Sequence, residues 1–224
     1  MKKRTRLADR RLPVYTKGEE LVNTLSHGLG VPLAIAALVL CVLKAVAHRG
    51  LTEIVASSVY GGCLILLYSM SALYHGLKPG TGKKVFQILD HCAIYLLIAG
   101  SYTLVCLGVL RRADPVLGWS IFTLEWGLTA LAVTLNAIDL RKFEVFSMIC
   151  YIGMGWAIIP VAGKLWQTMG PAGFWLTLAG GIAYTVGAVL FTVGIKVRWM
   201  HSLFHLFVLA GSVLHFFAFY LYGI

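Results

Sequence analysis

Long apolar runs separated by short polar breaks make up most of this chain after residue 20. A helix that crosses a bilayer needs about 20 mostly apolar residues. Seven segments meet this requirement, and we expect each to be a transmembrane helix that runs antiparallel to its neighbour, because the breaks are short. The predicted spans are residues 21–47, 52–77, 85–110, 115–137, 144–166, 171–195 and 200–223.

The composition supports the same class of protein. Of the 224 residues, 59% are hydrophobic and only 12% are charged, and the mean hydropathy is +0.82. These values predict an all-α polytopic membrane protein, a bundle of seven transmembrane helices. We expect residues 1–20 to form a cytoplasmic tail and residues 21–224 a single transmembrane domain. The tail is basic, but no short apolar core with a cleavage pattern follows it, so we do not expect a cleaved signal peptide.

The basic residues predict an orientation. If the N-terminus lies in the cytoplasm, 14 of the 19 lysines and arginines fall on the cytoplasmic side. This bias predicts a multi-pass protein of the cell (plasma or inner) membrane, with the N-terminus inside and the C-terminus outside. We interpret the net charge of +10 as attraction to membrane lipid, and expect no nucleic-acid partner, because the basic residues are scattered over separate loops. The spans lack a GxxxG motif, and the oligomeric state is left open.

Four polar side chains fall at the same end of otherwise apolar spans: His75, Asp90, His201 and His205. The helical rise places all four roughly 5–10 Å inside the cytoplasmic boundary. Metal-binding and charged side chains are costly inside a bilayer, so their presence there indicates function. Three imidazoles and an oxygen ligand suit zinc, and we therefore predict a Zn²⁺ site built from several helices.

The spacing within each helix favours this interpretation. His201 and His205 are four residues apart, so both imidazoles project from one helix face. Ser71 and His75 repeat that spacing, which places Ser71 near the metal or its bound water. If three histidines leave the fourth zinc position to water, the site is catalytic, and Asp90 serves as general base. If Asp90 fills that position, the site is closed and performs no chemistry.

Other polar residues belong to a second group. Asn23 and His27, four residues apart in the first span, either orient the metal ligands or bridge helices. Ser101 and His215 indicate either a partly polar interior cavity or a satisfied packing interface. Glu125, midway along residues 115–137, is the most costly remaining polar group, and the sequence assigns it no role.

Several motifs carry a family resemblance. They are EELVNTLSHGLG (Glu19–Gly30), SALYH (Ser71–His75), DHCAIYLLIAGSYT (Asp90–Thr103) and HSLFH (His201–His205). On these residues the chain resembles the bacterial hemolysin III family, a branch of the progestin and adipoQ receptor superfamily. The resemblance implies seven helices with the N-terminus inside. It also implies zinc near the cytoplasmic face, held by His75, His201 and His205, with Asp90 and Ser71 near the metal-bound water.

Three functions compete. The first is a zinc-dependent hydrolase of a lipid amide or ester, with membrane lipid as its substrate; the wider superfamily resembles alkaline ceramidases, which hydrolyse a lipid amide. The second is a non-enzymatic receptor or homeostasis protein in which zinc is structural. The third is a cytolysin or pore, which the family name suggests. A pore needs a continuous polar lining, whereas the polar residues here gather at one end.

Overall fold

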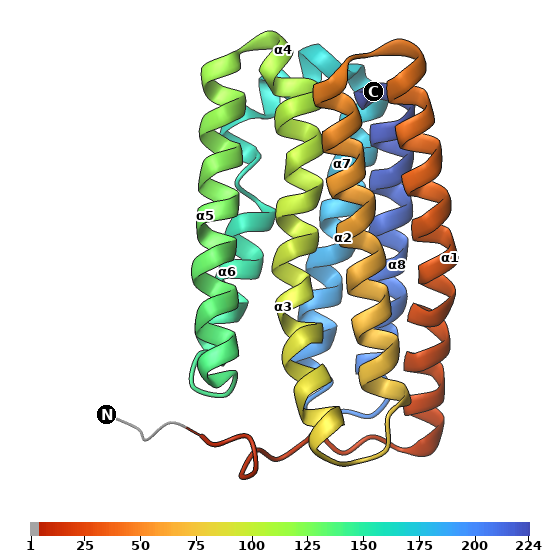
Figure 1. Cartoon of the computed structure of the whole chain (residues 1–224), viewed down its shortest axis with the longest axis vertical. Helices are drawn as coiled ribbons and strands as arrows, with labels where there is room; N and C mark the ends of the chain where they lie inside the picture. Colours follow the sequence, from red (N-terminus) through yellow and green to blue (C-terminus); the bar gives the residue numbers. More distant parts are fainter. Residues whose placement is uncertain (1–4) are drawn as a thin grey trace.

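The computed structural model describes residues 5–224 as a bundle of nearly parallel helices (Figure 1). The first four residues of the predicted tail lie outside the described residues. No strand occurs within residues 5–224, which confirms the all-α prediction. The helices are α1 (Lys17–His48), α2 (Leu51–Gly76), α3 (Thr81–Thr103), α4 (Arg111–Ala113), α5 (Pro115–Asp139), α6 (Glu144–Gly155), α7 (Ala162–Val193) and α8 (Met200–Ala218). Two π-helical segments, η1 (Leu104–Leu110) and η3 (Phe219–Gly223), extend α3 and α8, and a short 3-10 segment, η2 (Ile159–Val161), precedes α7.

Six helical segments of the described chain are long and apolar enough to cross a membrane. One of them, Glu144–Val193, has 50 residues. A continuous helix of that length would measure about 75 Å, more than twice the hydrocarbon thickness of about 30 Å. Its backbone is not helical at Gly170 (φ 68°, ψ 175°), where the chain turns back. In Figure 1, α6 and the stretch after it run one way, and the longer part of α7, after Gly170, returns. This segment therefore runs along the bundle twice, so the described chain makes seven passes, the number of spans that the sequence predicts.

The fifth predicted span differs from the structure in its regularity. We expected a continuous helix over 144–166, but α6 ends at Gly155 and an irregular turn leads into η2. Pro160 lies in η2 and lacks a backbone N–H, so it cannot continue the hydrogen bonding of α6. The first span also begins earlier than predicted, at Lys17. Thr16 caps this helix by accepting from the Glu19 backbone N–H, and the Glu19 side chain accepts from Thr16 in return.

Small residues let α1 and α2 approach closely. A Cβ atom added at Gly61 would lie 2.5 Å from Leu38 Cβ, and one added at Gly30 would lie 2.4 Å from the Tyr68 ring. Contacts this short exclude any larger side chain without movement of the backbone. In transmembrane bundles, such small residues allow van der Waals packing to hold helices together. The α1–α2 contact fixes the two helices that carry much of the site described below.

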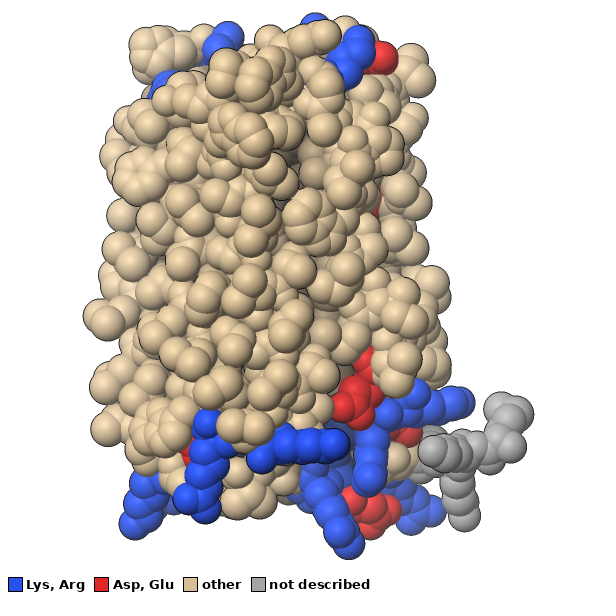
Figure 2. Space-filling view, turned by 180° about the vertical axis from the view of Figure 1, so that it is seen from behind, with Lys and Arg blue, Asp and Glu red and all other residues tan. Residues whose placement is uncertain are grey.

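The outer surface fits a lipid environment. Large apolar side chains on the outer face of α1 are exposed, including Leu25, Leu29 and Leu33 at 56%, 64% and 52%. A soluble monomer rarely exposes so continuous an apolar surface. Figure 2 shows the middle of the molecule almost free of charged residues, with lysine and arginine gathered at the two ends. More of them gather at the end that carries the N-terminal tail, as the sequence predicts.

Residues 5–16 form what we call the tail strap, a segment that runs across one end of the bundle (Figure 1). The Thr5 backbone N–H donates to Asp139 Oδ2 at the end of α5, at 2.7 Å. The Lys84 ammonium of α3 donates to the Ala8 carbonyl. The predicted tail is therefore packed against the helix ends at several points.

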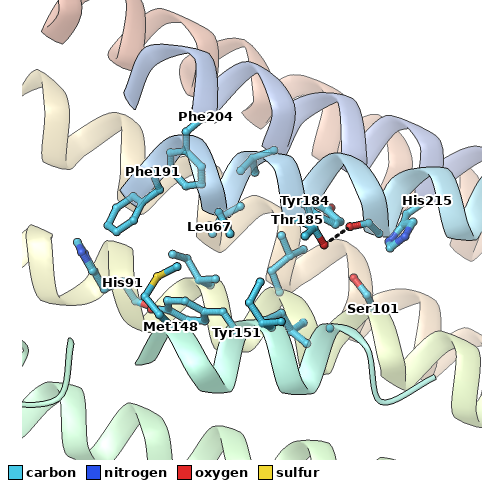
Figure 3. A pocket seen from close by; sticks show the side chains of 18 of the residues that line it. Leu67, His91, Ser101, Met148, Tyr151, Tyr184, Thr185, Phe191, Phe204 and His215 are labelled. Atoms are coloured by element: carbon cyan, nitrogen blue, oxygen red, sulfur yellow. Dashed lines mark hydrogen bonds between the residues drawn. The ribbon is translucent and has the colours of Figure 1, made fainter. Parts of the chain in front are cut away.

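An internal cavity of about 140 Å³ lies between α1, α2, α3, α6, α7 and α8. Ser101 and His215 both line it, which agrees with the first of the two interpretations, a partly polar cavity. Apolar side chains form most of the remaining wall. Figure 3 shows His91 at one end, Ser101 and His215 at the other, and Met148 and Tyr151 facing Phe191 and Phe204 between them.

Candidate metal centre

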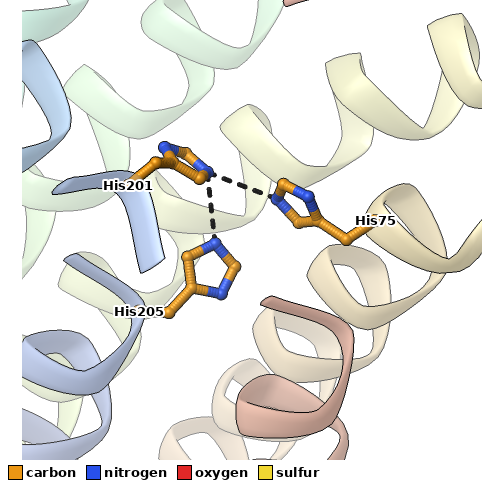
Figure 4. A group of neighbouring side chains, drawn as sticks. All are labelled: His75, His201 and His205. Atoms are coloured by element: carbon orange, nitrogen blue, oxygen red, sulfur yellow. Dashed lines mark hydrogen bonds between the residues drawn. The ribbon is translucent and has the colours of Figure 1, made fainter. Parts of the chain in front are cut away.

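Three buried imidazoles meet at the end of the bundle that the tail strap crosses. One ring nitrogen from each of His75, His201 and His205 lies within 4.8 Å of the other two. His201 Nε2 is 3.3 Å from His75 Nε2 and 3.2 Å from His205 Nε2 (Figure 4). The three residues are at most 6% exposed. The structure thus brings together the three histidines that the sequence analysis singled out.

The spacing of these nitrogens fits a metal ion. Ligand nitrogens about 2.0–2.1 Å from a tetrahedral zinc lie about 3.3 Å from one another. Two of the three separations match this value, and the third pair, His75 and His205, lies within 4.8 Å. The donor set, three imidazoles without thiolates, also suits zinc. His75, His201 and His205 are therefore the residues that can hold the ion.

Local structure explains how the two α8 histidines reach the site. They occupy successive turns at the start of α8 and share one face. The residue before this helix, Trp199, has a left-handed backbone (φ 66°), which is unfavourable for a tryptophan. The backbone N–H of Trp199 donates to Glu19 Oε1 at 2.6 Å. Buried Glu19 therefore ties the beginning of α1 to the beginning of α8 and holds His201 in place.

A carboxylate and an ammonium hold the third histidine. His75 Nδ1 lies 2.7 Å from Glu20 Oε2, so a protonated Nδ1 donates to this carboxylate and leaves the Nε2 lone pair facing the other histidines. Lys83 Nζ donates to Glu20 Oε1 at 2.7 Å and to the carbonyls of His75 and Leu77, each at 3.1 Å. Carboxylate–imidazole pairs of this kind fix the tautomer and orientation of metal-binding histidines.

Asn23 and His27 lie against the three histidines. Asn23 Nδ2 is 3.4 Å from His75 Nδ1, a longer contact than that of Glu20. The His27 ring centroid is 3.8 Å from that of His205, and neither His27 nitrogen has a hydrogen-bond partner among the described residues. Both side chains are at most 2% exposed. Their positions are compatible with both predicted roles, because these contacts touch the proposed ligands and also join α1 to α2 and α8.

Tyr15 of the tail strap covers the histidines. Its ring stacks on His201, with centroids 4.8 Å apart and planes 27° apart, and it also contacts His75 at 5.5 Å. Burial raises the pKa of the Tyr15 hydroxyl above its usual value, and the charges of Asp90 and Glu20 act in the same direction. A neutral aromatic ring thus lies against two of the three imidazoles, on the side of the tail strap.

Asp90 and Ser71 lie beside the histidine cluster and not within it. The Asp90 carboxylate is not a member of the group of ring nitrogens within 4.8 Å of one another. It lines the internal cavity together with Ser71 and His27. Asp90 Oδ2 is 3.7 Å from Nδ1 of its neighbour His91. The cavity therefore brings a carboxylate and a hydroxyl together beside His27, which contacts His205, whereas the three clustered histidines themselves do not line it.

Glu125 lies elsewhere, on α5. It is fully buried, and neither carboxylate oxygen has a hydrogen-bond partner within residues 5–224. A buried polar group without a partner is costly.

Sequence reasoning missed the side chains that support the site: Glu19, Glu20, Lys83 and Tyr15. A signal existed for one of them, because Glu20 precedes Asn23 by three residues and His27 by seven, so all three share one face of α1. Tyr15 and Lys83 gave no such signal. Their roles depend on where the tail strap and the start of α3 pack in space.

The fold and the cluster together define a class: a polytopic helical membrane protein with a buried three-histidine centre near one end of its bundle. A sequence model described as "Haemolysin-III related" matches residues 15–216. The chain therefore belongs to the haemolysin-III-related family, and the resemblance inferred from the sequence motifs is confirmed.

Individual relatives agree with this assignment. The chain is 42% identical to Hemolysin-3 of Bacillus cereus over 199 residues, which cover 89% of each chain. It is 35% identical to the Hemolysin-3 homolog of Bacillus subtilis (strain 168) over 204 residues, which cover 91% of this chain and 94% of the relative. A more distant similarity, 25% over 178 residues, links it to the human monocyte to macrophage differentiation factor, with 76% and 71% of the two chains covered. No solved structure matches the chain.

Proposed function

We propose that the protein binds Zn²⁺ through His75, His201 and His205 and hydrolyses an amide or ester bond of a membrane lipid. The observation that supports this most strongly is the convergence of three buried imidazole nitrogens, two pairs of which are 3.2–3.3 Å apart, the spacing of ligands around a tetrahedral zinc. Three protein ligands are typical of catalytic zinc sites, in which the fourth position is open.

When bound, zinc would polarise a carbonyl group and lower the pKa of water at the site. The residues of the chain provide the rest. Glu20 keeps the proton of His75 on Nδ1, on the side away from the cluster. Asp90, at the edge of the cavity, is placed to accept a proton, and the Ser71 hydroxyl is placed to orient the reacting group. Tyr15 limits the entry of bulk water.

A lipid substrate follows from the surroundings of the cluster. The internal cavity, which reaches the cluster through His27 and not through the proposed ligands, is lined mainly by leucine, isoleucine and aromatic side chains, including Leu67, Ile94 and Phe204. Such a wall accommodates a hydrocarbon chain, while the few polar groups at the histidine end can hold an amide or ester. The substrate of this reaction would already reside in the membrane.

Metal content tests the first part of the proposal. We expect the purified full-length protein to contain zinc by elemental mass spectrometry, and His75→Ala, His201→Ala and His205→Ala each to lose most of it. His48→Ala is the matched control, because His48 is an exposed histidine at the opposite end of α1. Equal zinc in His205→Ala and His48→Ala would refute the assignment of the ligands.

Turnover tests the second part. Protein reconstituted in lipid should release fatty acid from ceramide-like amides or from lipid esters, and both His205→Ala and Asp90→Asn should lose this activity. Asp90→Asn should keep its zinc, because Asp90 lies outside the histidine cluster. If the wild type releases no more product than His205→Ala on any of these lipids, the hydrolase proposal fails while zinc binding stands.

A structural role for zinc is the second candidate, and one observation favours it. The cluster joins α2 to α8, and Glu20 and Asn23 add α1, so a bound ion would brace three helices. In that case a chelator lowers the melting temperature, and no lipid is cleaved. Comparing thermal unfolding with turnover on the same samples separates this candidate from the hydrolase.

The structure offers less support for a pore. At the end opposite the cluster, all seven residues of η1, Leu104–Leu110, are buried, and six of the seven are apolar side chains. A water-filled path needs polar groups along its whole length.

For orientation, we propose that the end bearing the tail strap faces the cytoplasm, because most of the lysines and arginines gather there (Figure 2). Labelling of a cysteine introduced at exposed Arg6 by an impermeant reagent in intact cells would refute this orientation.

A further inference from the structure

A second cavity, of about 380 Å³, lies between the tail strap and the ends of the helices that it crosses. Residues 10–15 of the strap form one wall, and residues of α2, α3, α6, α7 and α8, with the turn that follows α5, form the others. His91, Met148, Tyr151 and Phe191 line this cavity and the internal cavity alike, so the two adjoin. The two cavities differ in charge, because three arginines line the second cavity and, among the described residues, none lines the internal cavity.

Arg10 is the central feature of this second cavity. It is only 6% exposed, and its Nε and Nη1 have no hydrogen-bond partner within the described chain. The nearby carboxylate of Asp139 is already engaged, since its oxygens accept from the backbone N–H groups of Thr5 and Lys142. A guanidinium stays charged even when buried, so its unpaired donors carry a substantial cost unless an acceptor occupies the cavity.

The other lining groups favour an anionic acceptor. Arg11 and Arg141 add two exposed cations, and Glu144 is the one carboxylate among the described lining residues. The hydroxyl of Tyr74, which is 1% exposed and lies beside Gln87, adds a further donor. Donors that converge from a strap and from helix ends match an oxyanion, and arginine is the usual partner of phosphate because its donors form a planar fork.

We propose that this cavity is a binding site for a phosphate group, with Arg10 as its main ligand and Arg141, Arg11 and Tyr74 as supporting contacts. The group is either the headgroup of an anionic phospholipid or free phosphate. The cavity lies at the end of the bundle where the apolar surface gives way to basic residues, which is the depth of lipid headgroups (Figure 2). His201 of the histidine cluster also lines this cavity, so the two sites adjoin, but the positive charge of the proposed site comes from its arginines.

Two probes distinguish the two sources. Full-length protein in nanodiscs of phosphatidylcholine is titrated with inorganic phosphate, against chloride at matched ionic strength, and thermal unfolding is followed. In parallel, the protein is placed in nanodiscs that contain equal parts of phosphatidylcholine and phosphatidylglycerol. Native mass spectrometry then identifies the lipid that stays bound when the protein is released from the nanodisc. Stabilisation by phosphate assigns free phosphate, and selective retention of phosphatidylglycerol without that stabilisation assigns the headgroup.

The variants test the residue assignment. Arg10→Gln should weaken binding of the effective probe by about tenfold to a hundredfold, the usual effect of removing a charged hydrogen-bonding partner. Arg6→Gln is the matched control, because Arg6 is an exposed arginine of the same strap that does not line the cavity. If Arg10→Gln fails to fold, as judged by circular dichroism, Arg141→Gln decides, since it removes an exposed lining cation and should weaken binding by a smaller factor.

Binding of neither probe, or equal binding by Arg10→Gln and Arg6→Gln, would overturn the proposal. Repeating the measurement after treatment with a chelator keeps this site separate from the histidine centre. Phosphate held by Arg10 survives removal of the metal, whereas phosphate bound only to a metal ion is lost, and that second result also rejects the site proposed here.

Discussion

Replacement of Glu20 by alanine should weaken zinc binding although Glu20 is not among the proposed ligands. The Glu20 carboxylate lies 2.7 Å from His75 Nδ1 and 2.7 Å from Lys83 Nζ. Without it, the His75 proton is no longer held on Nδ1, so the ring can take the tautomer that points an N–H at the cluster. The buried Lys83 ammonium also loses its counter-charge and keeps only its two carbonyl contacts.

The magnitude follows from comparable sites. Removing the carboxylate partner of a metal-binding histidine typically costs about 10–100-fold in metal affinity, which is about 1.4–2.8 kcal/mol. Glu20→Gln should cost less than about tenfold, because an amide oxygen still accepts from Nδ1–H, although the charge-assisted bond is roughly twice as strong. The order of zinc affinity should therefore be wild type, Glu20→Gln, then Glu20→Ala.

Competition with a fluorescent zinc chelator measures this affinity on the purified full-length protein. Glu144→Ala is the control, because it removes one exposed carboxylate at the same end of the bundle and no contact to the cluster. Equal affinities of Glu20→Ala and Glu144→Ala would show that the Glu20–His75 contact does not tune the centre, and the tautomer argument would be wrong.

Three further changes test the fold. Gly61→Ala should lower the free energy of unfolding by about 1–3 kcal/mol, because the added Cβ would meet Leu38 of α1. Gly62→Ala has open space at its Cβ and should leave that free energy unchanged in the same unfolding titration. Equal effects of the two substitutions would contradict close α1–α2 packing. Glu19→Ala should lower the free energy of unfolding by about 1–3 kcal/mol, because the hydrogen bond from the Trp199 backbone N–H is lost. Glu19→Gln should keep most of the stability. Identical melting curves for the wild type and Glu19→Ala would disprove this contact. Glu125→Met should raise the melting temperature by removing an unpartnered buried carboxyl, and a decrease would reveal a partner or ligand for Glu125.

The helices and the three histidines could be predicted because their signals are local. An apolar run of sufficient length specifies a membrane helix whatever it packs against. The i, i+4 spacing of His201 and His205 places them on one face, and positions counted from the helix ends gave a common depth with His75. The prediction that these residues share one layer thus needed no knowledge of tertiary packing, and the geometry of the cluster agrees with it.

The remaining features depend on contacts that the sequence does not encode locally. The pairing of Glu20 with Lys83 joins residues 63 positions apart, and the bond from Trp199 to Glu19 joins residues 180 apart. Sequence position alone gave no reason for the basic strap to pack under the bundle. The break in the fifth span has a visible cause in Pro160, which a prediction based on the length and hydropathy of residues 144–166 did not take into account.

The tail strap has a consequence for how the protein is handled and how it diversifies. The aromatic ring over the histidines and the arginine of the second cavity both come from a segment that precedes the first helix. An affinity tag or a truncation that displaces residues 10–15 would open the centre to solvent without altering any proposed ligand. Sequence changes confined to this segment can likewise adjust the rate of metal exchange while the membrane-embedded helices stay the same.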